Sequence, residues 1–168
     1  MINTTDHDLQ HFECILSSFE EIYPIWHDKL CLGRISKIKP MSSLCWRLPS
    51  KIVKDGSIFE SYSPTFWVVK DNEKIIGANS GFRTSDKVYR SRGLYVDLAY
   101  RKQEISQILL RQAILQGKKE ECHWIWSMPH KTTLPVYQKI GFKKRGKWLN
   151  EEVEFGPRCL TTRQIIYK

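Results

Sequence analysis

The sequence predicts a single domain of mixed α/β class, in which a central, mostly antiparallel sheet is flanked by helices on both faces. Its 168 residues fit one domain of ordinary size. Hydrophobic residues make up 41% and charged residues 27% of the chain, as in ordinary globular domains. Runs of β-branched and aromatic residues fill the middle of the chain, and helical spacing recurs before and after them. We expect the order helix, three strands, helix, strand, helix and two strands.

The first third of the chain has the apolar spacing of a helix. Thr5 and Asp8 fit a capping box, because a threonine side chain can accept a bond from the backbone amide three residues on. Apolar residues then recur every three or four positions, at Leu9, Phe12, Leu16, Phe19 and Tyr23. Pro24 interrupts this helix and can begin a second short turn. Prolines and glycines between residues 33 and 64 predict loops with one short helix.

The middle of the chain is predicted to form an antiparallel meander. Residues 65–70 read as a first strand, residues 74–82 as a second and residues 88–98 as a third. Gly77 and Gly81 weaken the second strand or allow a bulge in it. Three consecutive strands with short polar turns are typical of neighbours in one sheet.

The last part of the chain alternates helices with strands. A helix over residues 104–116 places Ile105, Ile108, Leu109 and Ala113 on one face, and Gly117 is a natural stop. A strand over 123–127 and a short helix before Gly141 follow, and strands over 142–148 and 159–167 end the domain. The strand–helix–strand unit from Val88 to Ser127 is a parallel crossover, so we expect a ligand where its strands end.

The charge balance favours an anionic partner. Lys and Arg number 27 against 18 Asp and Glu, a formal net charge of +9. This excess suits nucleic acid, an anionic membrane, an acidic protein or a phosphate-rich small molecule, and it does not choose among them. No apolar stretch approaches the roughly 20 residues of a membrane span. The N-terminal MINTTDHDLQ lacks a secretory signal, so we expect a cytoplasmic protein with no membrane partner.

The cysteines do not predict a metal site. Cys14, Cys31, Cys45, Cys122 and Cys159 are odd in number and widely spaced, and no C-x-x-C motif occurs. Without a secretory signal, reduced thiols are the default. We therefore expect no zinc and no disulfide.

One segment carries chemistry, namely the strand end, polar loop and helix start over residues 96–110. The unbonded N–H groups of the first helical turn and the helix dipole make a site for an anion. Arg101, Lys102 and Gln103 add side-chain donors to this site. The alternative is an ordinary strand-to-helix connection with a basic loop.

This segment resembles the signature of the GNAT superfamily, the general-control-related N-acetyltransferases. Residues in register with that signature are Val96, Tyr100, Arg101, Ile105, Leu109 and Leu110. A second element, residues 134–142 (LPVYQKIGF), resembles the family's short helix that ends in Tyr-x-Lys-x-Gly-Phe. The resemblance covers about residues 65–168, whereas the first 60 residues show little that matches.

Three positions depart from the family pattern. Glu104 and Ser106 stand where the loop has small residues, and His130 stands where many members have Asn. A carboxylate about 7 Å from a pyrophosphate charge would cost about 1–2 kcal/mol per charge at an effective dielectric of roughly 20–40. Because the backbone donors remain, we expect Glu104 to weaken binding rather than abolish it.

The resemblance implies a GNAT-like fold and an acyltransferase that moves an acetyl group from acetyl-CoA to an amine acceptor, which is a small molecule or a protein. It implies one domain over 1–168, with an acceptor-side part over 1–64 and an acyl-CoA-binding core over 65–168. Coenzyme A is the cosubstrate, and no metal is involved. The residues that would bind it are Val96, Asp97, Leu98, Arg101, Lys102, Gln103, Glu104, Ile105 and Ser106.

Roles in catalysis also follow from the resemblance. Tyr137 would be the general acid, since a phenol of pKa near 10 can protonate the leaving thiolate. The backbone N–H of Val96 or Asp97 would polarise the thioester carbonyl. Candidate bases are Tyr95, Asp97 and His130, with water as the alternative. The tryptophans divide into Trp124 and Trp126, expected in the core, and Trp26 and Trp46, expected there or in the acceptor pocket.

A second interpretation keeps the fold and removes the catalysis. Glu104, the net charge and the unmatched N-terminal part are also typical of a GNAT-like binding module for nucleic acid or a protein partner. Binding to nucleic acid would fall steeply with salt. Coenzyme A binding separates the two interpretations.

Overall fold

The structure is a computed structural model that describes residues 12–47, 51–101, 104–150 and 157–167. Its elements are β1 (Cys14–Ser17), α1 (Phe19–Ile25), the π-helical turn η1 (Trp26–Leu30), β2 (Leu44–Arg47), β3 (Lys51–Lys54), α2 (Ile58–Ser61), β4 (Thr65–Asp71), β5 (Lys74–Ser85), β6 (Val88–Val96), the 3₁₀ turn η2 (Leu98–Tyr100), α3 (Ile105–Lys119), β7 (Trp124–Ser127), α4 (Leu134–Lys139), β8 (Lys143–Leu149) and β9 (Arg158–Gln164).

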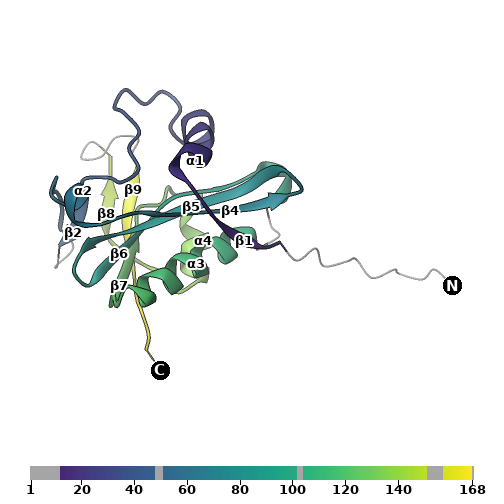
Figure 1. Ribbon diagram of the computed structural model, residues 1–168. Coiled ribbons are helices and arrows are strands. Elements are labelled where there is room, and N and C mark those ends of the chain that lie inside the picture. Colours follow the sequence, from purple (N-terminus) through teal and green to yellow (C-terminus); the bar gives the residue numbers. More distant parts are fainter. Residues whose placement is uncertain (1–11, 48–50, 102–103, 151–156, 168) are drawn as a thin grey trace.

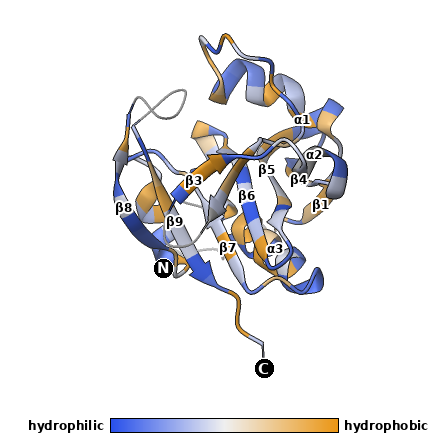
Figure 2. Ribbon diagram, turned by 90° about the vertical axis from the view of Figure 1, so that its left-hand side faces the viewer, coloured by the Kyte–Doolittle hydropathy of each residue, from blue (hydrophilic) through white to orange (hydrophobic). Residues whose placement is uncertain are grey.

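The predicted mixed α/β class is confirmed. A sheet runs in the order β1-β4-β5-β6-β7-β9-β8, and β2 and β3 form a separate hairpin. The pairing of β6 with β7 is parallel, and the other neighbours in this sheet are antiparallel. Figure 1 shows α1 and α3 on opposite sides of β4 and β5. The outer strand β8 is mostly hydrophilic (Figure 2), which protects an exposed sheet edge from pairing with other chains.

Two apolar layers hold the helices to the sheet. One layer packs α3 and α4 against one face, around Leu109, Ile125 and Phe142. The other packs α1 and η1 against the opposite face, around Ile22 and Trp26. Each strand that separates these layers is buried on both faces, so alternate side chains of β4 enter different cores.

The N-terminal helix prediction is wrong over its first described turns. Cys14–Ser17 form β1, which pairs antiparallel with β4, and the helix begins only at Phe19 after the Ser18 cap. The free edge of β4 offers backbone hydrogen bonds that helical spacing cannot reveal. Thr5, Asp8 and Leu9 lie outside the described residues.

Three further boundaries differ from the sequence prediction. Pro24 lies inside α1 and does not interrupt it, whereas the predicted second turn is present as the wider π turn η1. Gly117 does not end α3: it is buried in the helix, where a Cβ would lie 3.2 Å from the Tyr89 ring. The chain turns at Glu121, which has φ of +60°. The β2–β3 hairpin was not predicted, whereas the short helix α2 in the same region was.

Candidate active site

A bulge in β6 shapes the site. Ala78 faces Tyr95 and Ser80 faces Arg92, so Asn79 alone opposes the two residues between them. One of these is Gly93, whose φ of +81° favours glycine. A Cβ at Gly93 would lie 2.3 Å from the Trp26 indole, whose Nε1 donates to the Gly93 carbonyl at 3.0 Å. The bulge therefore depends on close contact with the N-terminal helical segment.

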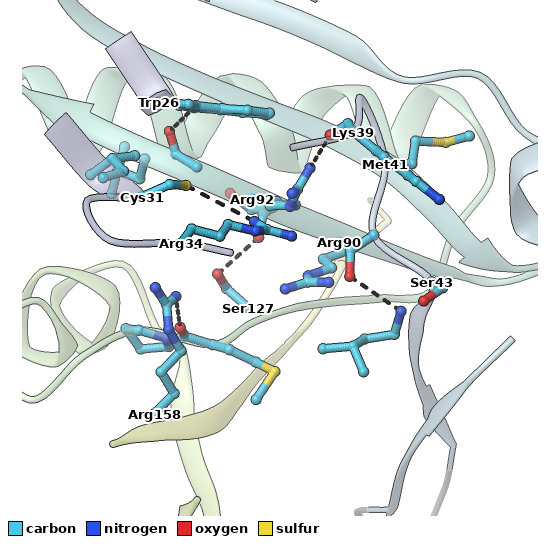
Figure 3. Close-up of a pocket in the computed structure, with 18 of the residues that line it drawn as sticks. Trp26, Cys31, Arg34, Lys39, Met41, Ser43, Arg90, Arg92, Ser127 and Arg158 are labelled. Atoms are coloured by element: carbon cyan, nitrogen blue, oxygen red, sulfur yellow. Dashed lines mark hydrogen bonds between the residues drawn. The ribbon is translucent and has the colours of Figure 1, made fainter. Parts of the chain in front are cut away.

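The bulge marks the place where β6 leaves β7. Pairing between the two strands covers only Val88–Arg90 against Trp124–Trp126. A cavity of about 810 Å³ lies beyond it. The cavity is lined by residues 90–94 of β6, by residues 127–130 at the end of β7 and just after it, by Thr133, by Tyr137 of α4, by Arg158 of β9, and by residues of the segments 26–44 and 54–56. Figure 3 shows side chains from these elements around the cavity.

Tyr137 lies in the wall of this cavity and is 4% exposed. Its hydroxyl lies 3.2 Å from the Ser127 Oγ, and that Oγ lies 2.8 Å from the Ser91 carbonyl. Because a serine has one hydroxyl proton, Ser127 accepts from Tyr137 when it donates to Ser91. Burial raises the pKa of Tyr137 above its usual value. The phenol therefore keeps its proton at neutral pH.

His130 is the candidate base that lines the same cavity. Burial, and then the charge of Arg158, lower its pKa below the usual 6.5, so the imidazole is neutral at pH 7. It donates a hydrogen bond to the Pro157 backbone, which leaves the other ring nitrogen as an acceptor.

Tyr95 and Asp97 lie outside the cavity lining. The Asp97 carboxylate accepts from the Ala99 N–H at 3.0 Å and pairs with Lys74 Nζ at 3.2 Å. The Ala99 bond, and then the contact with Lys74, lower the pKa of Asp97. The Tyr95 pKa is raised, chiefly by burial and then by Asp97. Asp97 thus acts as the cap of η2, and its low pKa makes it a weak base.

The two predicted amide donors are not equivalent. The Asp97 N–H donates to the Ile76 carbonyl at 2.8 Å within the sheet. Successive residues of an antiparallel strand direct their amides to opposite edges, so the Val96 N–H points to the side of β7. The Asp97 amide is therefore engaged in the sheet, and the Val96 amide is the remaining candidate to polarise a thioester carbonyl.

The start of α3 has the geometry of an anion site. The first bond within the helix runs from the Ile108 N–H to the Glu104 carbonyl, so the N–H groups of residues 105–107 precede it. Glu104 is the exposed N-cap, has φ of +61°, and its side chain makes no capping bond. Arg101 Nε donates to the Val96 carbonyl at 3.2 Å. This loop therefore directs backbone donors outward.

The other predicted loop residues vary in exposure. Ile105 is buried beneath the helix start, Ser106 is half-buried, and Leu98 in η2 is 76% exposed. Lys102 and Gln103 lie outside the described residues. The loop is anchored by Tyr100, whose hydroxyl donates to the Asp71 carboxylate.

Residues 63–144 match the family model described as an acetyltransferase (GNAT) domain. This segment, just under half of the chain, therefore resembles a GNAT-family domain. No curated protein sequence matches the chain significantly.

Solved structures share the fold of this chain. A Klebsiella pneumoniae protein assigned as an acyl-CoA N-acyltransferase is 10% identical, with a TM-score of 0.60, over 92% of this chain and 98% of that one. An aminoglycoside 6'-N-acetyltransferase complexed with coenzyme A is 14% identical, with a TM-score of 0.55, over 62% and 74%. A PaiA N-acetyltransferase from Thermoplasma acidophilum, also with coenzyme A, is 17% identical, with a TM-score of 0.52, over 64% and 65%. Such identities show the fold alone.

The sequence analysis did not identify the basic residues of the cavity. Arg90 and Arg92 alternate along β6 and so share one face, a signal present in the sequence. Arg158 reaches the same cavity from β9, and no sequence spacing indicates that convergence. Trp26 also lines the cavity, whereas Trp46 packs against Trp124 in the core. Trp126 is buried there, as expected.

Other expectations concern the cysteines, metal binding and membrane spans. All five cysteines are free thiols, and Cys45, Cys122 and Cys159 are buried. Among the described residues, no three His, Cys, Asp or Glu side chains are grouped to hold a metal ion. None of the helices described has the length and apolar content of a membrane span.

Proposed function

We propose that this protein is an acyl-CoA-dependent N-acyltransferase that moves an acetyl group from acetyl-CoA to an amine. The observation that carries the proposal is the bulge at Gly93, which separates β6 from β7 beside Tyr137. The neutral His130 imidazole and the protonated Tyr137 phenol line the cavity that this separation opens, and the Val96 N–H points to the side of β7 farther along β6. Coenzyme A complexes among the structural neighbours support the same cosubstrate.

The residues at one end of β6 fit the cosubstrate. The N–H groups of residues 105–107, with Arg101, would bind its pyrophosphate. The outward edge of β6 at Val96 would pair with the amide-containing pantetheine arm like an added strand. Glu104 opposes this fit, at about 1–2 kcal/mol per phosphate charge before screening by solvent. Lys102 and Gln103 remain proposed donors from the sequence alone.

The bound thioester supplies an activated acyl carbon, on which a nitrogen–carbon bond forms as the carbon–sulfur bond breaks. The Val96 N–H stabilises the negative charge that develops on the carbonyl oxygen. The amine must lose one proton and the leaving thiolate must gain one. Tyr137 gives its proton to the sulfur, and Ser127 holds the phenol oxygen in place when its own hydroxyl proton is donated to Tyr137 instead of to the Ser91 carbonyl. His130 accepts the proton from the amine, directly or through a water molecule.

The two parts of the chain have different roles in this proposal. The core over 65–168 binds acyl-CoA, and the part over 1–64 builds the acceptor side of the single domain. The division of the cavity wall supports this, because Trp26, Arg34 and Met41 face residues of β6 and α4 across it. The acceptor would then contact the segment that has least resemblance to the family.

Calorimetry with acetyl-CoA tests the proposal, followed by a screen of amines for thiol release. Acetyl-CoA should bind, and Arg101→Ala should weaken its binding. At least one amine should yield equal amounts of amide and free coenzyme A. If the wild-type protein binds no coenzyme A, the proposal fails and the non-catalytic binding module for nucleic acid or protein replaces it.

A further inference from the structure

The cavity beside Tyr137 is cationic. Seven of its described lining residues carry a positive charge, and none is Asp or Glu: Arg34, Lys37, Lys39, Lys54, Arg90, Arg92 and Arg158. Figure 3 shows Arg34, Arg90, Arg92 and Arg158 around one space, from the segment after η1, from β6 and from β9. A cavity with this lining repels a polycation and attracts an anion.

Arg90 is the decisive residue because its charge is buried and has no counter-ion among the residues that the structure describes. It is 6% exposed, and its Nε and Nη1 atoms have no hydrogen-bond acceptor among the described residues. Its guanidinium lies 4.6 Å from the centre of the Trp126 ring, which fixes its orientation. Burial, then the nearby charges of Arg92 and Arg158, lower the Arg90 pKa to about 9. A buried guanidinium that lacks acceptors lowers the stability of the fold unless a ligand accepts its hydrogen bonds and neutralises its charge.

Among the described residues, the neighbouring arginines bond to backbone carbonyls and to no carboxylate. Arg92 donates to the Lys39 carbonyl at 2.8 Å, and its guanidinium lies 4.9 Å from the centre of the Trp26 ring. Arg158 donates from Nη1 to the Met128 carbonyl at 3.0 Å, and its buried Nε has no acceptor among the described residues. These bonds orient the side chains, and no carboxylate of the described residues neutralises their charge. The cluster is therefore arranged in advance for an anion.

This cluster is separate from the proposed pyrophosphate site. Arg90 precedes Val96 by six strand residues, or roughly 20 Å along β6 at about 3.3 Å per residue. The amides of residues 105–107 lie beyond Val96, after η2. One cosubstrate pyrophosphate cannot reach both sites.

We propose that the amine acceptor carries an anionic group, a carboxylate or a phosphate, which binds between Arg90 and Arg158. This inference rests on the proposed acyltransferase function and specifies its substrate class. Arginine forks suit both anions, because two parallel N–H groups match two oxygen atoms. The anion holds the acceptor so that its amine lies toward Tyr137 and His130, which line the same cavity. Polyamines and other polycations are excluded as preferred acceptors.

Pairs of amines that differ only in the anionic group test the substrate class. With saturating acetyl-CoA, kcat/KM is measured for lysine against cadaverine, tyrosine against tyramine, and phosphoethanolamine against ethanolamine. At least one anionic member should exceed its partner by about 30-fold or more. The first two pairs report a carboxylate and the third a phosphate. If cadaverine, tyramine and ethanolamine react as fast as their anionic counterparts or faster, the proposal of an anionic acceptor is wrong, whereas the proposed acyltransferase function stands.

Variants of Arg90 test the site itself, with inorganic phosphate as a probe that needs no acyl-CoA. Arg90→Gln should abolish phosphate binding measured by calorimetry, and it should raise KM for the anionic acceptor by about 30-fold or more. Its affinity for acetyl-CoA should not change. Arg145→Gln is the matched control, since it removes the same charge from β8, outside the cavity lining. If Arg145→Gln has the same effect, net charge explains the binding and the proposal is wrong.

Thermal stability separates a ligand-binding role from a structural one. Without ligand, Arg90→Met should raise the melting temperature, because it removes an uncompensated buried charge and keeps the side-chain length. A lower melting temperature together with unchanged phosphate binding would show that Arg90 is a packing residue and would overturn the proposal. Failure of the acyltransferase proposal would appear differently, as the absence of acetyl-CoA binding by the wild-type protein.

Discussion

Glu104 is the position where one substitution tests both the backbone geometry and the charge of the proposed pyrophosphate loop. It caps α3 with φ of +61° and ψ of 13°, a conformation that costs a residue with a Cβ about 1–2 kcal/mol. Its carboxylate also opposes the phosphate charges by about 1–2 kcal/mol each at 7 Å and an effective dielectric of roughly 20–40. Because Glu104 is exposed, solvent and salt reduce this repulsion to about 1 kcal/mol.

Glu104→Gly removes both penalties. The free energy of unfolding should rise by about 1 kcal/mol, which corresponds to roughly 2–4 °C in melting temperature for a chain of this size. The dissociation constant for acetyl-CoA should fall by about fivefold or more, since about 1 kcal/mol corresponds to a fivefold change in binding. The gain in affinity should shrink as salt is added.

Glu104→Gln is the matched control because it removes the charge and keeps the strained backbone. Calorimetry should show a similar gain in affinity for this variant, and thermal unfolding should show no gain in stability. If the glutamine variant binds acetyl-CoA no better than wild type, the electrostatic argument is refuted. If the glycine variant unfolds at a lower temperature, the argument from the left-handed conformation is refuted.

The remaining predictions concern the acid, the base and the bulge. Tyr137→Phe should lower the chemical rate about 10²–10⁴-fold and leave acetyl-CoA affinity unchanged; wild-type single-turnover rates would make Tyr137 a core aromatic only. Since the His130 pKa lies below 6.5, kcat/KM should fall with decreasing pH through that pKa, in addition to the loss from protonation of the amine. His130→Gln should remove the steeper low-pH part of the profile, and an unchanged profile would point to water as the base. Gly93→Ala should lower the free energy of unfolding by about 2–3 kcal/mol, because its Cβ would meet the Trp26 indole and its φ is positive; urea unfolding that matches wild type would contradict the packing argument.

The central meander, the crossover and the short helix α4 could be predicted from the sequence because their signals are local. Alternation in residues 65–70 and helical spacing from Ile105 depend on neighbours a few positions apart. The same locality made the polar loop before α3 and the Tyr137 segment recognisable. The resemblance leads one to expect a small residue at position 104, and the positive φ found there agrees with that expectation. The identity of Glu104 does not by itself indicate this backbone conformation.

Tertiary contacts decided the features that local signals could not indicate. Cys14–Ser17 became a strand because the edge of β4 bonds their backbone, and Gly117 stayed helical because its missing side chain lets α3 approach Tyr89. The arginine cluster has the same origin. Arg34, Arg90 and Arg158 are distant in the chain and meet only because the Gly93 bulge opens β6 from β7, with β9 beside β7. Residue spacing within one strand or helix reports which side chains share a face, whereas the surfaces that face one another across a cavity are set by the packing of separate elements.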